Sequence, residues 1–309
     1  MARRIVFAVL ALAAVGWPFL VENRYLTHIA VLVTISMTLA LSLNMMLRIG
    51  QLSVVHAAFM GLGAYTSALL SMRLGLPFLL AFPAAGLLVA AIAAALGPVF
   101  LRVKGVYFVL LTFALGEGIV LIFQEWVSLF GGNNGIYGIP KASLLGFAMS
   151  TPRAYYLFGL CLAGIAFLVA VRIFRSALGA VLDSLNENED LSQSLGVNAR
   201  SYRVCVFTVS GFFAGLGGSV YAHYTSFLSP EAFSFWTLVD LLVINVVGGI
   251  ASPIGPVVGA ILLVPLPELL RDAKQYQMLT YGLLLMTFVI FLPSGIVGGI
   301  RDLRRRRRT

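Results

Sequence analysis

Four ionisable side chains interrupt long apolar stretches of this 309-residue chain, and they are the first candidates for chemistry: His56, Glu117, His223 and Asp240. Ionisable groups are costly inside a membrane, so residues of this kind are candidates for function by default. Glu117 is expected to face the interior of a helix bundle, either as a structural contact or as part of a polar pathway. For His56, a capped helix start and a gate fit equally well. His223 and Asp240 are expected near the outer interface, where the structural interpretation is favoured.

No catalytic or metal-binding pattern accompanies these residues. The sequence contains no H-E-x-x-H, G-x-S-x-G or Walker A arrangement, so neither catalysis nor ATP hydrolysis is expected in this chain. An intramembrane enzyme would need a catalytic dyad, and the sequence offers none. Cys161 and Cys205 both fall in apolar stretches and are interpreted as packing residues, with no disulfide framework. The glycine-rich segment 131–140 predicts tight turns, because no Gly-Lys-Ser/Thr follows it.

The composition is that of an integral membrane protein. Hydrophobic residues make up 60% of the chain and charged residues 11%, whereas a soluble domain has about 25% charged residues. Since a membrane-spanning helix takes about 20 apolar residues, we expect an all-α, polytopic integral membrane protein with about 8–10 transmembrane helices. The predicted spans lie near 5–21, 26–47, 52–72, 77–101, 105–124, 154–174, 204–225 and 276–293, with a broken hydrophobic region at 237–270.

Two of these predicted segments have alternatives. Residues 5–21 follow two arginines and contain an Ala-Leu-Ala triplet, as a cleaved signal peptide would. The triplet lies inside the apolar core, however, which favours an uncleaved span. In the broken region, the prolines and glycines of 248–256 cannot continue a regular helix. Either two short tilted helices cross there, or a re-entrant hairpin dips into the membrane and returns.

The distribution of positive charge predicts the orientation. Of the 21 lysine and arginine residues, fifteen fall on one side of the predicted spans. The positive-inside rule places that side, and with it both termini, in the cytoplasm. Segment 175–203 and the basic tail 301–309 are then cytoplasmic, while 125–153 forms an external loop. The net charge of +9 is therefore explained by topology and by attraction to anionic membrane lipids, and nucleic acid is not an expected partner.

Small residues at helical spacing predict close helix packing. In the third span they are Ser53, Ala57, Gly61, Ala64 and Ala68. In the seventh span they are Gly211, Gly215 and Ser219, with Ala214, Gly218 and Ala222 beside them. These faces predict tight packing within one bundle, or alternatively an interface that lines a moving pathway.

One polar stretch, 183–196, breaks the series of apolar segments. It is long enough for a cytoplasmic helix, which would present carboxylates to a soluble partner. Gly196 is placed to end that helix with a positive φ angle.

Three stretches together resemble the LivM-type permeases of branched-chain amino acid ABC importers, over most of the chain. Residues 50–65 resemble the family segment G-Q-L-S-x-G-H-A-A-F-x-G-x-G-A-Y, with Val55 where the family usually has glycine. Residues 101–108, followed by Thr112 and Glu117, resemble the segment L-R-x-x-G-x-Y-F-x-x-x-T and its downstream acidic residue. The third stretch runs from 176 to 271 and includes the sequences ENE, LG, AHY, SPE, GG, GP and PELL in the family's order.

This resemblance implies a single transmembrane permease domain over 1–309, whose cytoplasmic loop 175–203 contains a short helix that docks on an ATPase subunit. The ATPase-coupling residues would be Gly179, Asp183, Glu187, Asn188, Glu189, Asp190, Leu195 and Gly196. The candidate translocation pathway would include Gln51, Ser53, His56, Tyr107, Thr112 and Glu117. The family commonly has arginines around this loop, where this chain has Ala180, Asp183 and Asn186. We therefore expect the partner ATPases to carry a more basic groove.

The resemblance also implies partners in a bacterial inner membrane. These are a second, homologous permease subunit, two ATPase subunits that carry ATP and Mg²⁺, and a periplasmic or lipid-anchored substrate-binding protein. The chain itself would hold no cofactor. The substrate would be leucine, isoleucine, valine or a related small polar solute, since similar permeases also move other amino acids, amides or urea. The alternative from another class is a proton-coupled secondary transporter that uses Glu117 or Asp240.

Overall fold

The computed structural model describes residues 15–17, 23–144, 147–269, 279, 282–283, 286–287 and 295–299, and long helices dominate these residues. Six helical stretches among them are long and apolar enough to cross a membrane, which confirms an all-α polytopic membrane protein. They are α2 (Arg24–Arg48), α4 (Phe78–Phe100), α5 (Val106–Glu125), α7 (Pro152–Arg175), α10 (Ala199–Thr225) and Pro230–Gly248, which joins η2 (Pro230–Phe233) to α11 (Phe235–Gly248). Most of the predicted span 5–21, most of the span 276–293, and the tail 301–309 lie outside the described residues.

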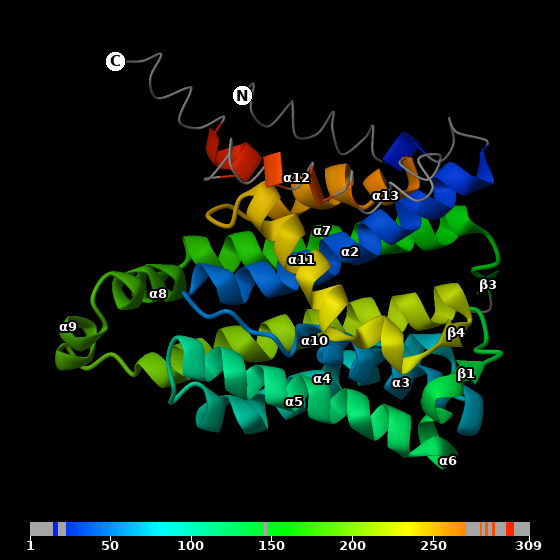
Figure 1. The fold of residues 1–309 in the computed structure, drawn as a ribbon, viewed down its shortest axis with the longest axis horizontal. Coiled ribbons are helices and arrows are strands. Elements are labelled where there is room, and N and C mark those ends of the chain that lie inside the picture. The colour runs from blue at the N-terminus through cyan, green and yellow to red at the C-terminus, as the bar shows by residue number, and fades with distance from the viewer. Residues whose placement is uncertain are drawn as a thin grey trace.

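The long helices run side by side, so that the bundle has two distinct ends (Figure 1). One end carries α8 (Ala177–Glu187) and α9 (Glu189–Ser194). The opposite end carries α6 (Val127–Phe130), η1 (Gly132–Asn134) and four short strands: β1 (Ile136–Tyr137), β2 (Ser143–Leu144), β3 (Phe147–Ala148) and β4 (Phe227–Leu228). The strand β1 pairs with β4 and β2 pairs with β3, both antiparallel. The polar segment and the glycine-rich loop therefore lie at opposite ends of the bundle.

The centre of the bundle is α10, which packs closely against α4 and against α3 (His56–Arg73). A Cβ atom on Gly218 would clash with the backbone oxygen of Met60, and one on Gly63 would clash with the backbone of Gly215. The expected packing by small residues of α10 is thus confirmed. The expected face of α3 is only partly right, because Gly61 packs under Phe123 and Phe233 while Gly63 meets α10.

The predicted interruption of the broken region is confirmed. The helix α11 ends at Gly248, and α12 (Ile254–Leu263) and α13 (Leu266–Leu269) follow it. Gly249 has a φ angle of 111°, in the region that glycine adopts without strain. The two helices α11 and α12 then pack against each other so closely that a Cβ atom on Gly248 or Gly259 would clash with the backbone of the other helix.

Two buried asparagines tie this hairpin to α2. The Asn44 amide donates to Asn245 Oδ1 at 3.0 Å and to the backbone oxygen of Ile250 at 3.1 Å. The Asn245 amide donates in turn to the backbone oxygens of Ala40 at 3.1 Å and Leu241 at 2.9 Å. Side-chain amides that bond between helices hold membrane bundles together. The position of α11 relative to α2 is therefore fixed by polar bonds as well as by packing.

Candidate functional site

The polar segment 183–196, which was expected to form one helix, is divided between two, so that expectation is wrong. Asn188 has an extended backbone (φ −153°, ψ 101°), and its Oδ1 accepts a hydrogen bond from the backbone nitrogen of Leu191 at 3.0 Å. An asparagine stabilises a helix start better than a helix interior, which explains why α8 stops and α9 begins here. Gly196 has a φ angle of 87°, as the sequence predicted. Gly179 allows the corner between α7 and α8, because a Cβ atom there would press on the backbone of Phe174.

The two short helices expose a mixed acidic and apolar surface. Of the predicted coupling residues, Asp183, Glu187, Asn188, Asp190, Leu195 and Gly196 are exposed. Leu195 is 78% exposed and Leu191 is 59% exposed. Large exposed apolar side chains at the tip of a polar segment are typical of an interaction site. Leu191 was missed from the sequence, although its spacing of four from Leu195 places both on one helix face.

Glu189 does not present its carboxylate to a partner, which corrects the sequence interpretation. Its Oε1 and Oε2 accept from the Arg203 guanidinium at 3.1 and 2.9 Å, and Lys104 Nζ lies 2.8 Å from Oε2. The side chains of Arg203 and Glu189 are 6% and 15% exposed. We call these three residues the Glu189 tie. It joins α9 to the start of α10 and to the connection between α4 and α5.

The residues of the tie line an open cavity of about 670 Å³. Its polar lining includes Arg102, Lys104, Glu189, Gln193, Arg200 and Arg203. Partial burial raises the pKa of Glu189, but the hydrogen bonds and charges of Arg203 and Lys104 outweigh this effect, and the pKa lies below its ordinary value of 4.5. The carboxylate is therefore charged at neutral pH, and α9 is held here mainly by charge.

Four of the six candidate pathway residues meet at the start of α3. Gln51, Ser53, His56 and Thr112 are all buried. Ser53 Oγ lies 3.0 Å from His56 Nδ1, and Thr112 Oγ1 accepts from the backbone nitrogen of Val54 at 3.2 Å. The bond to Thr112 joins the start of α3 to α5. Among the residues described, Gln51 Oε1 and His56 Nε2 are buried without a hydrogen-bond partner, as are a few polar atoms elsewhere in the bundle.

The other two candidates lie apart from this cluster. Tyr107 is 75% exposed near the start of α5. Glu117 lines a small void together with Val54, Ala57 and Phe235, so it faces the bundle interior as expected. The void lies between α3, α5 and the start of α11, and it holds about 10 Å³. This space is too small for a solute, since ligand sites usually measure about 300–1,000 Å³.

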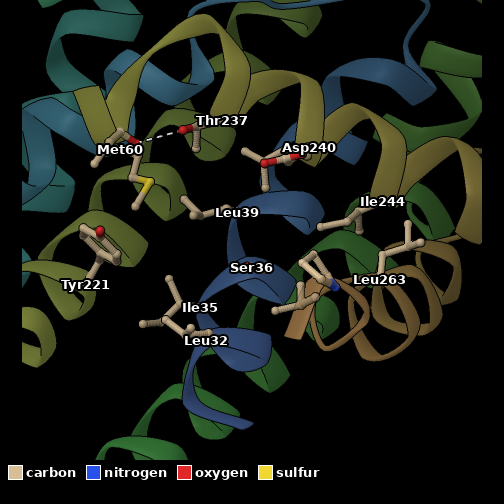
Figure 2. A pocket seen from close by; sticks show the side chains of 14 residues that line it. Leu32, Ile35, Ser36, Leu39, Met60, Tyr221, Thr237, Asp240, Ile244 and Leu263 are labelled. Atoms are coloured by element: carbon tan, nitrogen blue, oxygen red, sulfur yellow. Dashed lines mark hydrogen bonds between the residues drawn. The ribbon is translucent and has the colours of Figure 1, made fainter. Parts of the chain in front are cut away.

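A larger cavity lies beside Asp240, where the sequence favoured a structural role (Figure 2). It measures about 360 Å³, and its walls come from α2, α3, α10, α11 and the segment that includes α12 and α13. Ser36, near the middle of the 25-residue helix α2, is one of its lining residues, so the cavity reaches the middle of the bundle. Sequence reasoning missed this site because its walls come together only in the fold.

His223 has the structural role that the sequence favoured. Its Nε2 lies 2.9 Å from Ser67 Oγ, and its Nδ1 lies 2.7 Å from the backbone oxygen of Pro140. His223 therefore links the end of α10 to the loop that carries the strands.

Cys161 and Cys205 are free and exposed, so their interpretation as packing residues is wrong. The described part of the chain contains no group of three His, Cys, Asp or Glu residues that could hold a metal ion.

Comparisons with known proteins identify the chain's relatives. The family model for the permease component of branched-chain amino acid transport systems matches residues 25–292. The LivM permease of the high-affinity branched-chain amino acid transport system of Escherichia coli is 34% identical, over 96% of this chain and 75% of its own length. A probable LivM permease of Methanocaldococcus jannaschii is 24% identical over 63% of this chain and 61% of its own length.

A ribose import permease of Haemophilus influenzae is 25% identical over 74% of this chain and 72% of its own length. No solved structure matches the chain significantly. The family model and the Escherichia coli relative each cover most of the chain, which therefore belongs to the family of permease components of branched-chain amino acid transport systems.

Proposed function

We propose that this chain moves leucine, isoleucine, valine or a related small polar solute across a bacterial inner membrane. Membership of the family makes it the permease component of an ABC transporter rather than an enzyme, and ATP is hydrolysed by a separate component. The observation that carries the choice of substrate is the similarity to the Escherichia coli permease along almost the whole chain. The ribose permease among the relatives is why related solutes stay in the proposal.

The proposed complex contains a second, similar permease, two ATPase subunits that bind ATP and Mg²⁺, and a substrate-binding protein outside the membrane. The end of the bundle that carries α8 and α9 faces the cytoplasm in this proposal. Its support is the cluster of cations at that end, namely Arg102, Lys104, Arg172, Arg175, Arg200 and Arg203. The loop with the strands then faces the binding protein.

In the proposed mechanism, α9 is the element that contacts an ATPase. Leu191 and Leu195 enter an apolar part of the ATPase groove, and Asp183 and Asp190 meet basic residues around it. When the ATPases close on ATP, α9 moves with them. The Glu189 tie transmits this movement to α10 and to the connection between α4 and α5, because a carboxylate held by two cations resists separation from both.

The test is uptake of radiolabelled leucine into proteoliposomes that contain the complete complex. We expect Leu191→Ser with Leu195→Ser to abolish uptake while the complex still assembles, since hydroxyl groups cannot replace the apolar contact. Leu168→Ser is the matched control, because Leu168 is 65% exposed on α7, far from α9. Uptake that persists without ATPases and disappears with the proton gradient would instead place the protein among secondary transporters.

A further inference from the structure

The cavity beside Asp240 is partly open, and it combines mostly apolar walls with one carboxylate, that of the exposed residue Asp240. Leu32, Ile35 and Leu39 of α2 form one wall, and Ile244 and Leu263 close the side nearest the α11–α12 hairpin (Figure 2). Asp240 lies on the α11 wall among these aliphatic side chains. A small-molecule site is typically mostly apolar, with a few polar groups that fix the orientation of the ligand. The cavity has this character.

The carboxylate of Asp240 has no partner among the described residues. Among the described residues, the only acidic side chain in an ion pair is that of Glu189. No hydrogen bond between described residues involves Asp240. The hydroxyl group of Thr237, one turn earlier on α11, is already used, because it donates to the backbone oxygen of Ala232 at 2.9 Å. A charge at membrane depth is costly unless it is paired. Within the described part of the chain, no residue supplies a cation to Asp240, and a ligand is a natural source of one.

We propose that this cavity binds the transported amino acid, with Asp240 accepting hydrogen bonds from its α-ammonium group. The aliphatic side chains of α2, α11 and α12 then enclose the hydrocarbon side chain of the ligand. The volume of about 360 Å³ suits a molecule of this size, because it lies at the small end of the usual range for ligand sites. The assignment rests on the proposed function and adds to it a site, a charge partner and a reason for aliphatic preference.

The site also has a place in the mechanism. Its walls join α2 to α10 and α3 on one side and to the α11–α12 hairpin on the other. The Asn44–Asn245 bonds hold that hairpin to α2. A movement of α10 that is driven from α9 therefore changes the distance between the walls of the cavity. Closing of the cavity on one side and opening on the other would carry the ligand through the bundle.

The experiment measures ligand binding separately from transport. Cys161 and Cys205 are replaced by serine, and Ser36→Cys provides a single thiol in the cavity wall. The thiol is labelled in the complete complex, without ATP, by a small membrane-permeant reagent. We expect millimolar leucine to slow labelling several-fold, and we expect 2-hydroxy-4-methylpentanoate, which lacks the ammonium group, to give no protection.

The same background then receives Asp240→Asn and Asp240→Glu. We expect Asp240→Asn to remove the protection and to lower leucine uptake about tenfold, which corresponds to about 1.4 kcal/mol. Asp240→Glu should retain part of the protection and part of the uptake, since it keeps the negative charge. Glu125→Gln, which removes an exposed carboxylate at the end of α5, is the control and should change neither.

Three results would overturn the site. These are equal protection by leucine and by the hydroxy acid, full protection in Asp240→Asn, and loss of complex assembly in Asp240→Asn, which would assign the carboxylate to a subunit contact. The proposed function fails differently, because it would show as absence of leucine uptake in the unaltered complex.

Discussion

At the scale of single residues, the charges around α9 divide into those that face outward and one that does not. Asp183, Glu187 and Asp190 are exposed, whereas Glu189 is bound by Arg203 and Lys104. The sequence indicated four carboxylates for a partner because neighbouring acidic residues look alike in a polar stretch. The bend at Asn188 turns Glu189 toward α10, and the cations that receive it lie 85 positions before it and 14 positions after it in the sequence. Only the fold brings them together.

The Glu189 tie makes a stability prediction. We expect Glu189→Gln to lower the free energy of unfolding of the solubilised chain by about 1.5–3 kcal/mol at pH 7, the usual range for hydrogen bonds to charged groups. Because the folded-state pKa of Glu189 lies below the ordinary 4.5, this contribution is fully present above that value and is lost as the pH falls through the lowered pKa. Thermal unfolding of the wild type and the variant from pH 8 to pH 3 measures it. A difference that stays constant down to pH 3, or that is absent at pH 7, would contradict the tie.

Asp240 marks the limit of reasoning from single residues. A carboxylate in an apolar stretch was a candidate from the sequence, but position alone favoured a structural role near the interface. The cavity on which the proposed ligand role depends has walls from α2, α3, α10, α11 and the segment beyond them. The reverse holds for His223, whose structural role was expected and whose partners Ser67 and Pro140 are now identified.

At the scale of elements, hydrophobic length predicted the helices well, with both ends within two residues for the spans 105–124 and 154–174. Membrane helices are easy to recognise in a sequence, because a segment that crosses lipid must be apolar, about 20 residues long, and hydrogen-bonded within itself. Helix faces were harder to predict. Small residues lie on several faces of α3. The sequence favoured the face with Gly61, while Gly63, together with Met60 and Ala64, lies against α10.

The packing of α10 predicts which glycines tolerate a methyl group. We expect Gly218→Ala to destabilise the chain by about 1–3 kcal/mol, the usual cost of overpacking, because its Cβ atom would clash with the backbone of α3. Gly164→Ala on α7 is the matched control, since nothing lies within 4 Å of its added Cβ atom. That change should stabilise the chain by about 0.5–1 kcal/mol through helix propensity. Chemical denaturation in detergent compares the two, and similar effects of both substitutions would contradict the close approach of α10 to α3.

At the scale of the whole molecule, the bundle separates two kinds of end. One end carries short polar helices and arginines, and the other carries turns and paired strands (Figure 1). The two ends are connected by α10, a single helix of 27 residues. In the proposed mechanism, a movement that begins at α9 reaches the loop at the far end through this helix. His223 lies near the end of that helix and is bonded to the loop at Pro140, so the strand-bearing end is connected to the same helix that Arg203 joins to α9. One rigid element thus contacts both ends and the cavity between them.

The orientation of these ends makes the last prediction. In a chain with Cys161→Ser and Cys205→Ser, Ser194→Cys on α9 and Tyr137→Cys on β1 each supply one exposed thiol. We expect a membrane-impermeant maleimide to label Tyr137→Cys from outside intact spheroplasts and to leave Ser194→Cys unlabelled until the membrane is opened. The physical reason is that the arginines near α8 and α9 resist transfer across the membrane. The reverse pattern would invert the whole bundle, and the ATPases would then lie on the wrong side to contact α9. Detection of both chains with a permeant maleimide is the control, because it shows that each thiol reacts when it is reached.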